Sequence, residues 1–398
     1  MSGEAAPEQV DAVVHDAVIL DSDPATFSTD FADTWLAVAD GIVVGRGRGA
    51  HWQRFVRSGT EVVDAAGAFL APAFVDIHTH GAGGRNVEDG AGHLGEILSV
   101  HRAHGTRALV LSFVSDTIDG LSAALRTGAQ AARDHRCVLG LHAEGPFLSP
   151  DFKGAHSPEV LTSPTAEAVD RLLDAADGQL VQVTLAPELP GALDAIERFT
   201  SAGVRVAIGH TAAGYDEAAR AFDAGASILT HVFNGMSGIH HRSPGPILAA
   251  VDAPHVTLEL INDGIHVQAP AARMIADLAP GRVALITDAM AATGMGDGDY
   301  VLGALPVRVE DGVARVRRDD GSVGSIAGST LTMDEAVRRA VAEVGMSPVA
   351  AVQAASLVPL RALGRLEPEV HSLLRVGQPA DCVLLDDRMR TQKVWIGD

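Results

Sequence analysis

Two kinds of hydrophobic pattern occur along this chain of 398 residues. In the middle, short apolar runs alternate with Ala-, Glu- and Arg-rich segments whose apolar positions repeat with the helical period. Such alternation is typical of βαβ units and a parallel sheet. The apolar runs are Ala73–His80, Arg107–Val114, Val138–Glu144, Leu180–Ala186, Arg205–His210, Ile228–Val232, Val256–Ile261 and Val283–Thr287. Eight strand–helix units predict a closed (β/α)8 barrel of the TIM type.

The two ends of the chain have a different pattern, in which short strands and turns replace the helices. Trp35–Val38 and Gly41–Val44 flank a turn that predicts a hairpin, and Ala380–Leu385 has the same strand-like character near the C-terminus. Neither end of the chain alone is large enough to form a stable hydrophobic core, so we expect one small β-sandwich domain built from both ends. The predicted domains are residues 1–71 with 365–398 (β-sandwich) and residues 72–364 (barrel).

One further break in the pattern follows the eighth apolar run. A Gly-rich stretch, Gly294–Gly303, leads into the hairpin-like segment Leu305–Arg317. We expect this hairpin to be an excursion from the barrel before its last helices.

Composition limits the kinds of partner. The chain has 30 basic and 51 acidic residues, a formal charge of -21, which argues against nucleic acid or an anionic membrane as the main partner. An anionic substrate would therefore need a local cationic pocket. No segment reaches the length of a membrane span, and residues 1–10 lack the basic and apolar regions of a signal peptide. With two cysteines that read as reduced thiols, the expected compartment is the cytoplasm.

Side chains that bind metals occur at the ends of several predicted strands. Alternation along a strand places Asp76, His78 and His80 on one face of the first strand. Similar polar residues occur at the ends of the third, fifth, sixth and eighth runs: Glu144, His210, His231 and Asp288. The C-terminal ends of barrel strands form the active-site face, so we expect these residues to meet there. Imidazole and carboxylate ligands suit a divalent metal with an open position for water.

These residues can be given chemical roles. Glu144, His210 and His231 would form the principal metal site, and His78 and His80 a second site with Glu144 bridging the two. Asp288 would be the general base and acid that moves the proton of the attacking water. The alternatives are that His78 and His80 only surround a one-metal site, and that Asp288 caps a helix. We read His142, on the same face as Glu144, as barrel filling or a partner of the metal ligands.

The motifs of the barrel resemble one branch of the metal-dependent amidohydrolase superfamily. The chain resembles the family of N-acetylglucosamine-6-phosphate deacetylases, in order and over nearly its whole length. The motifs that carry the resemblance are His142-Ala143-Glu144-Gly145-Pro146-Phe147, Lys153-Gly154-Ala155-His156, Gly209-His210-Thr211, Thr230-His231-Val232-Phe233-Asn234-Gly235-Met236, Asp263-Gly264-Ile265-His266, Thr287-Asp288-Ala289-Met290 and Ile326-Ala327-Gly328-Ser329-Thr330-Leu331.

The resemblance implies a substrate and a mechanism. It implies hydrolysis of the acetamide of N-acetylglucosamine 6-phosphate, with one or two divalent ions per subunit; zinc is expected, with iron, manganese, cobalt and cadmium as alternatives. His156 or His266 would steady the developing oxyanion, and Arg242 would reach the phosphate, across the interface of a homodimer. The implied substrate-binding residues are Ala155, His156, Asn234, Gly235, Arg242, Asp263, Gly264, Ile265, His266, Ile326, Ala327 and Gly328.

Some members of the family carry amide side chains in place of the first-strand histidines and use one metal, whereas this chain keeps His78 and His80.

Two other functions stay open. A different amidohydrolase, such as an N-acyl-amino-acid deacylase or a cyclic-amide hydrolase, would often bridge two metals with a carboxylated lysine; this chain offers Glu144 there instead. A non-catalytic barrel used for binding should have lost a ligand or Asp288, and neither is missing.

Overall fold

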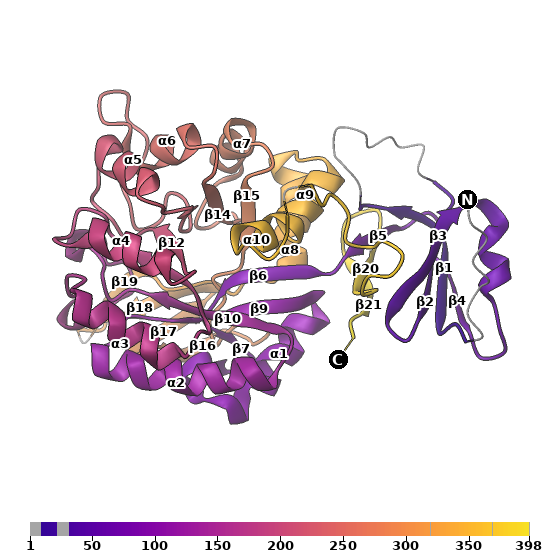
Figure 1. The fold of residues 1–398 in the computed structure, drawn as a ribbon, viewed down its shortest axis with the longest axis horizontal. Coiled ribbons are helices and arrows are strands. Elements are labelled where there is room, and N and C mark those ends of the chain that lie inside the picture. Colours follow the sequence, from indigo (N-terminus) through magenta and orange to yellow (C-terminus); the bar gives the residue numbers. More distant parts are fainter. Residues whose placement is uncertain (1–8, 22–31, 319, 368, 398) are drawn as a thin grey trace.

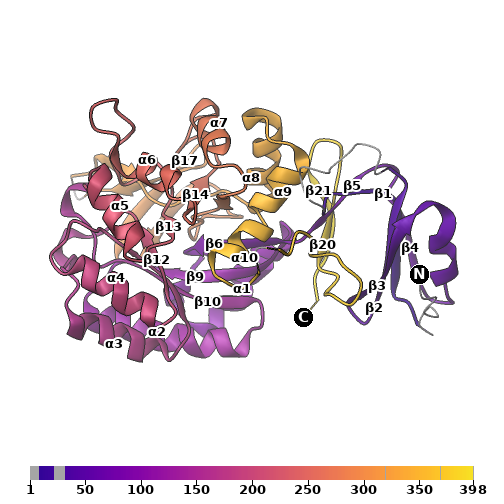
Figure 2. The same cartoon turned by 45° about the horizontal axis from the view of Figure 1, so that its top comes forward.

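The computed structural model describes residues 9–21, 32–318, 320–367 and 369–397. A barrel surrounded by helices occupies one side of the molecule, and a small β domain that carries the N-terminal strands lies beside it (Figures 1 and 2). Residues 1–8, on which most of the expectation about a signal peptide rests, lie outside the described part.

Eight parallel strands form the barrel and stand in the order β15-β14-β13-β12-β11-β10-β9-β6. The sheet closes between its first and last strands, where Thr79 and Ala289 form a parallel bridge and Asp288 N donates to His78 O at 2.9 Å. The barrel strands are β6 (Phe74–Thr79), β9 (Thr106–Phe113), β10 (Val138–Glu144), β11 (Leu180–Leu185), β12 (Arg205–Ile208), β13 (Ile228–Leu229), β14 (Thr257–Ile261) and β15 (Val283–Ile286). The predicted barrel is thus confirmed, although the sixth strand is shorter than its apolar run.

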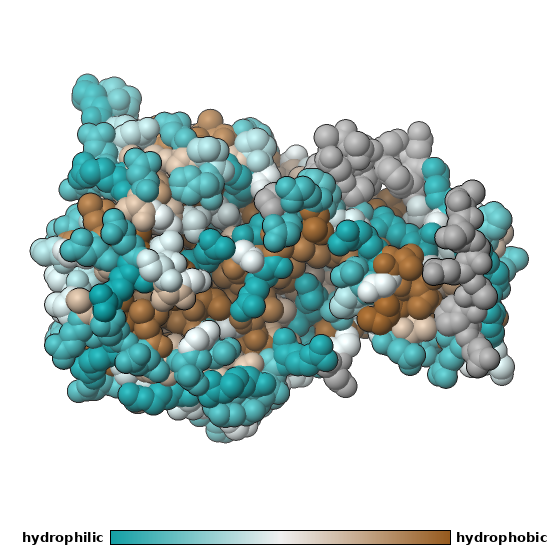
Figure 3. Space-filling model, in the orientation of Figure 1, coloured by the Kyte–Doolittle hydropathy of each residue, from teal (hydrophilic) through white to brown (hydrophobic). Residues whose placement is uncertain are grey.

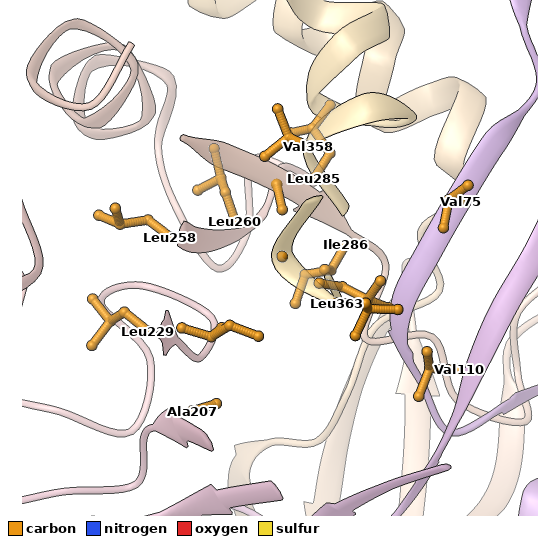
Figure 4. Close-up of a cluster of buried hydrophobic side chains, with 14 of the residues drawn as sticks. Val75, Val110, Ala207, Leu229, Leu258, Leu260, Leu285, Ile286, Val358 and Leu363 are labelled. Atoms are coloured by element: carbon orange, nitrogen blue, oxygen red, sulfur yellow. The ribbon is translucent and has the colours of Figure 1, made fainter. Parts of the chain in front are cut away.

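Helices cover the outside of the barrel and bury their apolar stripes against it. In α2, for example, Leu121, Leu125 and Ala129 lie on one face and are buried. The helices are α1 (Leu94–Ala103), α2 (Ile118–Asp134), α3 (Ala166–Ala176), α4 (Ala192–Ser201), α5 (Tyr215–Asp223), α6 (Gly245–Asp252), α7 (Ala269–Leu278), α8 (Met333–Arg339), α9 (Pro348–Ala354) and α10 (Leu357–Ala362). Figure 4 shows the resulting core, in which Leu260, Leu285 and Val358 come from two strands and one helix.

The small β domain draws on both ends of the chain. Strand β1 (Ala12–Ile19) pairs with β2 (Thr34–Ala39) along most of its length, with β4 (Glu61–Asp64) through its first half and with β5 (Phe69–Pro72) at its end. Strand β2 continues into β3 (Ile42–Arg48) by the predicted hairpin, and β20 (Cys382–Leu385) pairs with β5 and β21 (Thr391–Trp395). Leu36, Leu70 and Leu384 share one core. The division of the chain at residues 71 and 365 stays a prediction.

A four-stranded antiparallel sheet lies between β15 and α8. Its strands are β16 (Gly298–Leu302), β17 (Leu305–Glu310), β18 (Val313–Arg317) and β19 (Val323–Ile326). The predicted hairpin supplies β17 and β18, and the structure adds a strand on each side of it. Leu302 and Val307 are buried on the face that packs against Met290 and Ala291, just beyond β15. A short pair, β7 (Gly81–Ala82) and β8 (Arg85–Asn86), follows β6.

The surface is mostly polar. Figure 3 shows hydrophilic residues over much of the visible face, with apolar patches between the helices and on the small domain. Among the described residues, the structure contains no helix that is long and apolar enough to cross a membrane. Both cysteines are free thiols; Cys382 is buried and Cys137 is half-buried.

Candidate active site

Three of the predicted ligands converge at the C-terminal mouth of the barrel. Glu144 ends β10, and His210 and His231 follow β12 and β13. Glu144 Oε1 lies 3.2 Å from His210 Nε2 and 3.1 Å from His231 Nε2, and the two nitrogens are 3.0 Å apart. All three side chains are buried.

A second group of three forms beside the first one. His78 Nε2 and His80 Nε2 are 3.2 Å apart, and Asp288 Oδ1 lies 3.2 Å from the His80 nitrogen and 3.8 Å from that of His78. Glu144 joins the two groups, because its Oε1 is 3.5 Å from His78 Nε2 and its Oε2 is 3.2 Å from His80 Nε2. This is the arrangement that a bridging carboxylate would need.

The spacing of these atoms fits a metal ion. Metal–ligand bonds of about 2.0–2.1 Å at tetrahedral angles place ligand atoms about 3.3 Å apart, close to the separations around Glu144 Oε1. His210 Nδ1 lies 2.9 Å from the Phe152 carbonyl oxygen, and His80 Nδ1 lies 2.8 Å from that of Ser112. These carbonyls can only accept, so each Nδ1 carries a proton and each Nε2 is the nitrogen available to a metal ion. A bound ion would take the place of any proton on Nε2.

The pKa values of the carboxyl groups also fit a metal site. Burial by itself would raise the pKa of Glu144, but His78 and the hydrogen bonds from His156, His210 and His231 hold that pKa well below its usual value. Burial likewise opposes ionisation of Asp288, yet His80 and His78 lower its pKa. Burial would lower the pKa of His80, and the carboxylates of Asp288 and Glu144 raise it to about 9. Both acids are therefore anionic at neutral pH, as ligands and a general base must be.

The backbone takes unusual conformations at three of these residues. His210, His231 and Asp288 have φ angles of 47°, 24° and 49°, in or near the left-handed region that non-glycine residues rarely adopt. Each lies just beyond its barrel strand, where the chain leaves the sheet. Left-handed conformations of this kind cluster at functional sites, where the surrounding structure holds them in place.

One residue that the sequence analysis did not single out supports the site from inside the barrel. Glu259, on β14, is fully buried, and its Oε2 lies 3.1 Å from His78 Nδ1. Its Oε1 accepts a hydrogen bond from Gln182 Nε2 at 2.8 Å. A signal was present, because Glu259 is a carboxylate in the otherwise apolar run Val256–Ile261. A glutamate buried at that depth needs partners, and it finds one in a predicted metal ligand.

His142 behaves as expected for a residue beside the ligands. Its Nδ1 lies 2.9 Å from Ser112 Oγ and its Nε2 lies 2.8 Å from Thr184 Oγ1. Its ring packs edge-on against His78 at 4.6 Å between centroids. Burial and the nearby His78 lower its pKa well below the usual value. With both nitrogens engaged, His142 fills the barrel and steadies its neighbours.

A cavity of about 220 Å³ opens onto the two groups. Most of the predicted substrate-binding residues lie around it: Ala155, His156, Asn234, Gly235, His266, Ile326 and Gly328. Four further residues in its lining were not predicted: Val114, Gly154, Leu302 and Ser325. Ala327 is buried between Ile326 and Gly328.

The structure does not bring the other predicted residues into this cavity. Arg242 is exposed on the loop before α6, and Ile265 is 41% exposed. Asp263 is occupied within its own turn: its Oδ1 accepts from Ile265 N and His266 N at 2.8 Å, and its Oδ2 lies 2.6 Å from His266 Nδ1. Gly264 occupies the left-handed position of that turn, with a φ of 74°. This turn therefore positions His266 at the cavity.

Comparison with known proteins agrees with this fold. Residues 69–398 match the amidohydrolase family, and the chain belongs to that family. It is similar to the N-acetylgalactosamine-6-phosphate deacetylase of Escherichia coli O157:H7, with 39% identity over 84% of this chain and 88% of the relative. It is also similar to the N-acetylglucosamine-6-phosphate deacetylase of Vibrio furnissii, with 36% identity over 82% of this chain and 81% of that one.

A solved structure shares nearly the whole fold. It is an aspartate-to-alanine variant of N-acetyl-D-glucosamine-6-phosphate deacetylase from Mycobacterium smegmatis in complex with N-acetyl-D-glucosamine 6-phosphate. It is 38% identical to this chain and covers 97% of each, with a TM-score of 0.86. The similarity includes the small β domain as well as the barrel.

Proposed function

We propose that this chain hydrolyses the acetamide of N-acetyl-D-glucosamine 6-phosphate to D-glucosamine 6-phosphate and acetate, a reaction of amino-sugar catabolism and cell-wall sugar recycling. One observation carries the proposal: Glu144 joins two groups of metal-binding side chains, with Asp288 at the edge of one of them, at the base of a cavity. The chain is similar in sequence and in fold to deacetylases of N-acetylated sugar phosphates.

Glu144, His210 and His231 would hold the principal metal ion, and His78 and His80 a second one. Zinc suits a set of imidazole and carboxylate ligands, and iron, manganese, cobalt and cadmium remain alternatives. A bound divalent ion supplies an acidified water and polarises the amide carbonyl. The number of ions per subunit follows from whether the His78–His80 group is filled.

Asp288 moves the proton in this proposal. Its anionic carboxylate, with a lowered pKa, can accept a proton from water as the water attacks the acyl carbon. The same carboxylic acid then gives the proton to the nitrogen as the C–N bond breaks. Asp288 Oδ1 lies 3.2 Å from His80 Nε2, so the carboxylate is next to the atoms that would hold the ion.

His156 is placed to stabilise the developing negative charge on the carbonyl oxygen. Ser115 N donates to His156 Nδ1 at 3.3 Å, so the ring proton lies on Nε2, which is 3.5 Å from Glu144 Oε2. Burial lowers the pKa of His156 to about 4, so the ring is neutral at physiological pH. A neutral imidazole whose N–H points into the cavity can donate to an oxyanion.

The phosphate would be bound in the part of the cavity that Asn234 and His266 line. No arginine or lysine is among the described residues that line the cavity. Because Arg242 is exposed and lies outside it, we propose that Arg242 completes the site of the other subunit in a homodimer. A phosphorylated sugar is too polar to cross a bilayer unaided, so we propose the cytoplasm as the compartment.

A second candidate substrate is N-acetylgalactosamine 6-phosphate, favoured by the similarity to the Escherichia coli enzyme. The two sugars differ in the configuration of one hydroxyl group. Amine release should therefore be measured from both phosphorylated sugars and from unphosphorylated N-acetylglucosamine, with the metal-replete protein. We expect the highest kcat/KM with N-acetylglucosamine 6-phosphate; a higher value with the galacto sugar would favour the second candidate. Turnover of the unphosphorylated sugar alone would contradict both.

A further inference from the structure

A second cavity lies directly behind one wall of the active-site cavity. It has a volume of about 310 Å³ and is mostly apolar, with Phe113, Leu121 and Val160 among its lining residues. The two cavities share four lining residues: Val114, Ala155, His156 and Leu302. These four residues form the wall between the two cavities.

Val114 and Leu302 form the apolar part of this wall. Leu302 is 4% exposed in the core of the four-stranded sheet, and Val114, just beyond β9, packs against that core. Gly303, which follows Leu302 in the sequence, lies so close to Val114 that a Cβ atom on it would overlap Val114 Cγ2. Val114 N also donates to Glu88 Oε1 at 3.3 Å, which fixes the backbone of the wall. Gly303 and Glu88, which both line the second cavity, therefore hold Val114 in place.

The position of the wall relates it to the acyl group of the substrate. His156 belongs to the same wall and presents its Nε2 proton toward Glu144, where the carbonyl oxygen is proposed to lie. The polar residues Asn234 and His266 line the active-site cavity as well and suit the sugar phosphate. The acyl methyl group is one bond from the carbonyl carbon and is apolar, and Val114 and Leu302 offer it an apolar surface in the same wall as His156.

We propose that Val114 and Leu302 limit the acyl group to acetyl, and that the cavity behind them accepts a longer neutral acyl chain once the wall is opened. This inference rests on the proposed function. The reaction stays amide hydrolysis: water adds to the acyl carbon, the C–N bond breaks, the nitrogen gains a proton, and a longer carboxylate leaves in place of acetate. Glu88 and Asp116 line the second cavity, and no described lysine or arginine does, so an anionic chain such as succinyl is excluded.

The test compares kcat/KM for N-acetyl-, N-propionyl-, N-butyryl- and N-succinyl-glucosamine 6-phosphate in wild type and variants. Val114→Ala and Leu302→Ala should each raise the butyryl-to-acetyl ratio roughly tenfold or more, the scale set by one or two methylenes in an apolar pocket. Val114→Ile should lower the propionyl-to-acetyl ratio. Leu305→Ala enlarges the second cavity but leaves the wall intact, so its ratios should equal those of wild type.

The outcomes separate the two proposals. If wild type hydrolyses the acetyl sugar but Val114→Ala and Leu302→Ala leave the butyryl-to-acetyl ratio unchanged, these two residues do not limit the acyl group. The same conclusion follows if Leu305→Ala raises that ratio as much as the two wall variants do. If the wall variants raise kcat/KM for the N-succinyl sugar as much as for the N-butyryl sugar, the longer acyl chain does not enter the second cavity. If wild type releases amine from none of the sugars, the proposed function fails and this inference fails with it.

Discussion

His78 Nδ1 and Glu259 Oε2 lie 3.1 Å apart in the interior of the barrel, where both side chains are fully buried. A carboxylate at this position holds the proton on Nδ1 and turns Nε2 toward the other ligands. Gln182 holds the second oxygen of the same carboxylate. Glu259 therefore sets the orientation of a predicted metal ligand without facing the cavity itself.

Glu259→Gln should weaken metal binding at the His78–His80 group by about 10- to 100-fold, since the neutral amide holds the histidine less firmly. The Glu144–His210–His231 group should keep its ion. Elemental analysis after equilibration with limiting zinc measures this difference, because the metal content per subunit should fall further in the variant than in wild type. Glu197→Gln, at an exposed position on α4, is the matched control. Equal metal content in all three proteins at every zinc level would show that Glu259 does not position His78.

Asp288→Asn should abolish the proton transfer and keep the shape of the site. General acid–base catalysis contributes about 10²- to 10⁴-fold, so kcat should fall by at least that range. Metal content should stay the same, because Glu144, His210 and His231 are untouched. Steady-state kinetics and elemental analysis on one preparation check both statements. Retained turnover would remove Asp288 from the mechanism.

Arg242→Ala should raise KM for the phosphorylated sugar and leave kcat nearly constant. A charge-assisted hydrogen bond to phosphate contributes about 1.5–3 kcal/mol, or roughly 10- to 100-fold in KM. Arg126→Ala removes an equally exposed arginine from α2 and should leave KM unchanged. Analytical ultracentrifugation of the same samples should show a dimer. An unchanged KM in Arg242→Ala would place the phosphate elsewhere.

His101 should make stability depend on pH in the acidic range. It is 2% exposed on α1 with Nε2 3.2 Å from Thr79 Oγ1, and burial lowers its pKa from 6.5 to about 4. Between those values the unfolded chain binds a proton that the folded protein excludes, so stability falls as the pH drops from 6.5 toward 4. The loss from this residue is on the order of 3 kcal/mol at the acidic end.

His101→Gln removes that titration and can keep the hydrogen bond to Thr79. Its free energy of unfolding, measured by denaturant titration, should therefore vary less between pH 4 and 6.5 than that of wild type. His51→Gln changes an exposed histidine and should follow the wild-type curve. Identical slopes for His101→Gln and wild type would show that His101 is protonated in the folded protein.

Most of the barrel could be predicted because its strands are buried on both faces. Runs such as Arg107–Val114 and Val283–Thr287 are mostly apolar, which is the pattern of a parallel sheet. The four-stranded sheet was only half predicted. The exposed strand Val323–Ile326 has two glycine or serine residues in four, so its place depends on pairing with β18 and leaves little trace in the sequence.

The chemistry of the site was easier to predict than its walls. His78, Glu144 and Asp288 stand out because polar residues at the ends of buried strands are costly without a role. Val114 and Leu302 carry no such signal, since an apolar residue near a strand end is ordinary. The exposure of Arg242 also could not be read from the sequence, because it depends on how the loop before α6 folds.

The most direct test of the account measures acetate release from N-acetylglucosamine 6-phosphate by one preparation in three states: as loaded with zinc, after chelation, and after zinc is returned. We expect turnover in the first state, its loss in the second and its recovery in the third. Full turnover by the chelated protein, with metal shown by elemental analysis to be absent, would contradict the assignment of Glu144, His210 and His231 as ligands that the reaction needs.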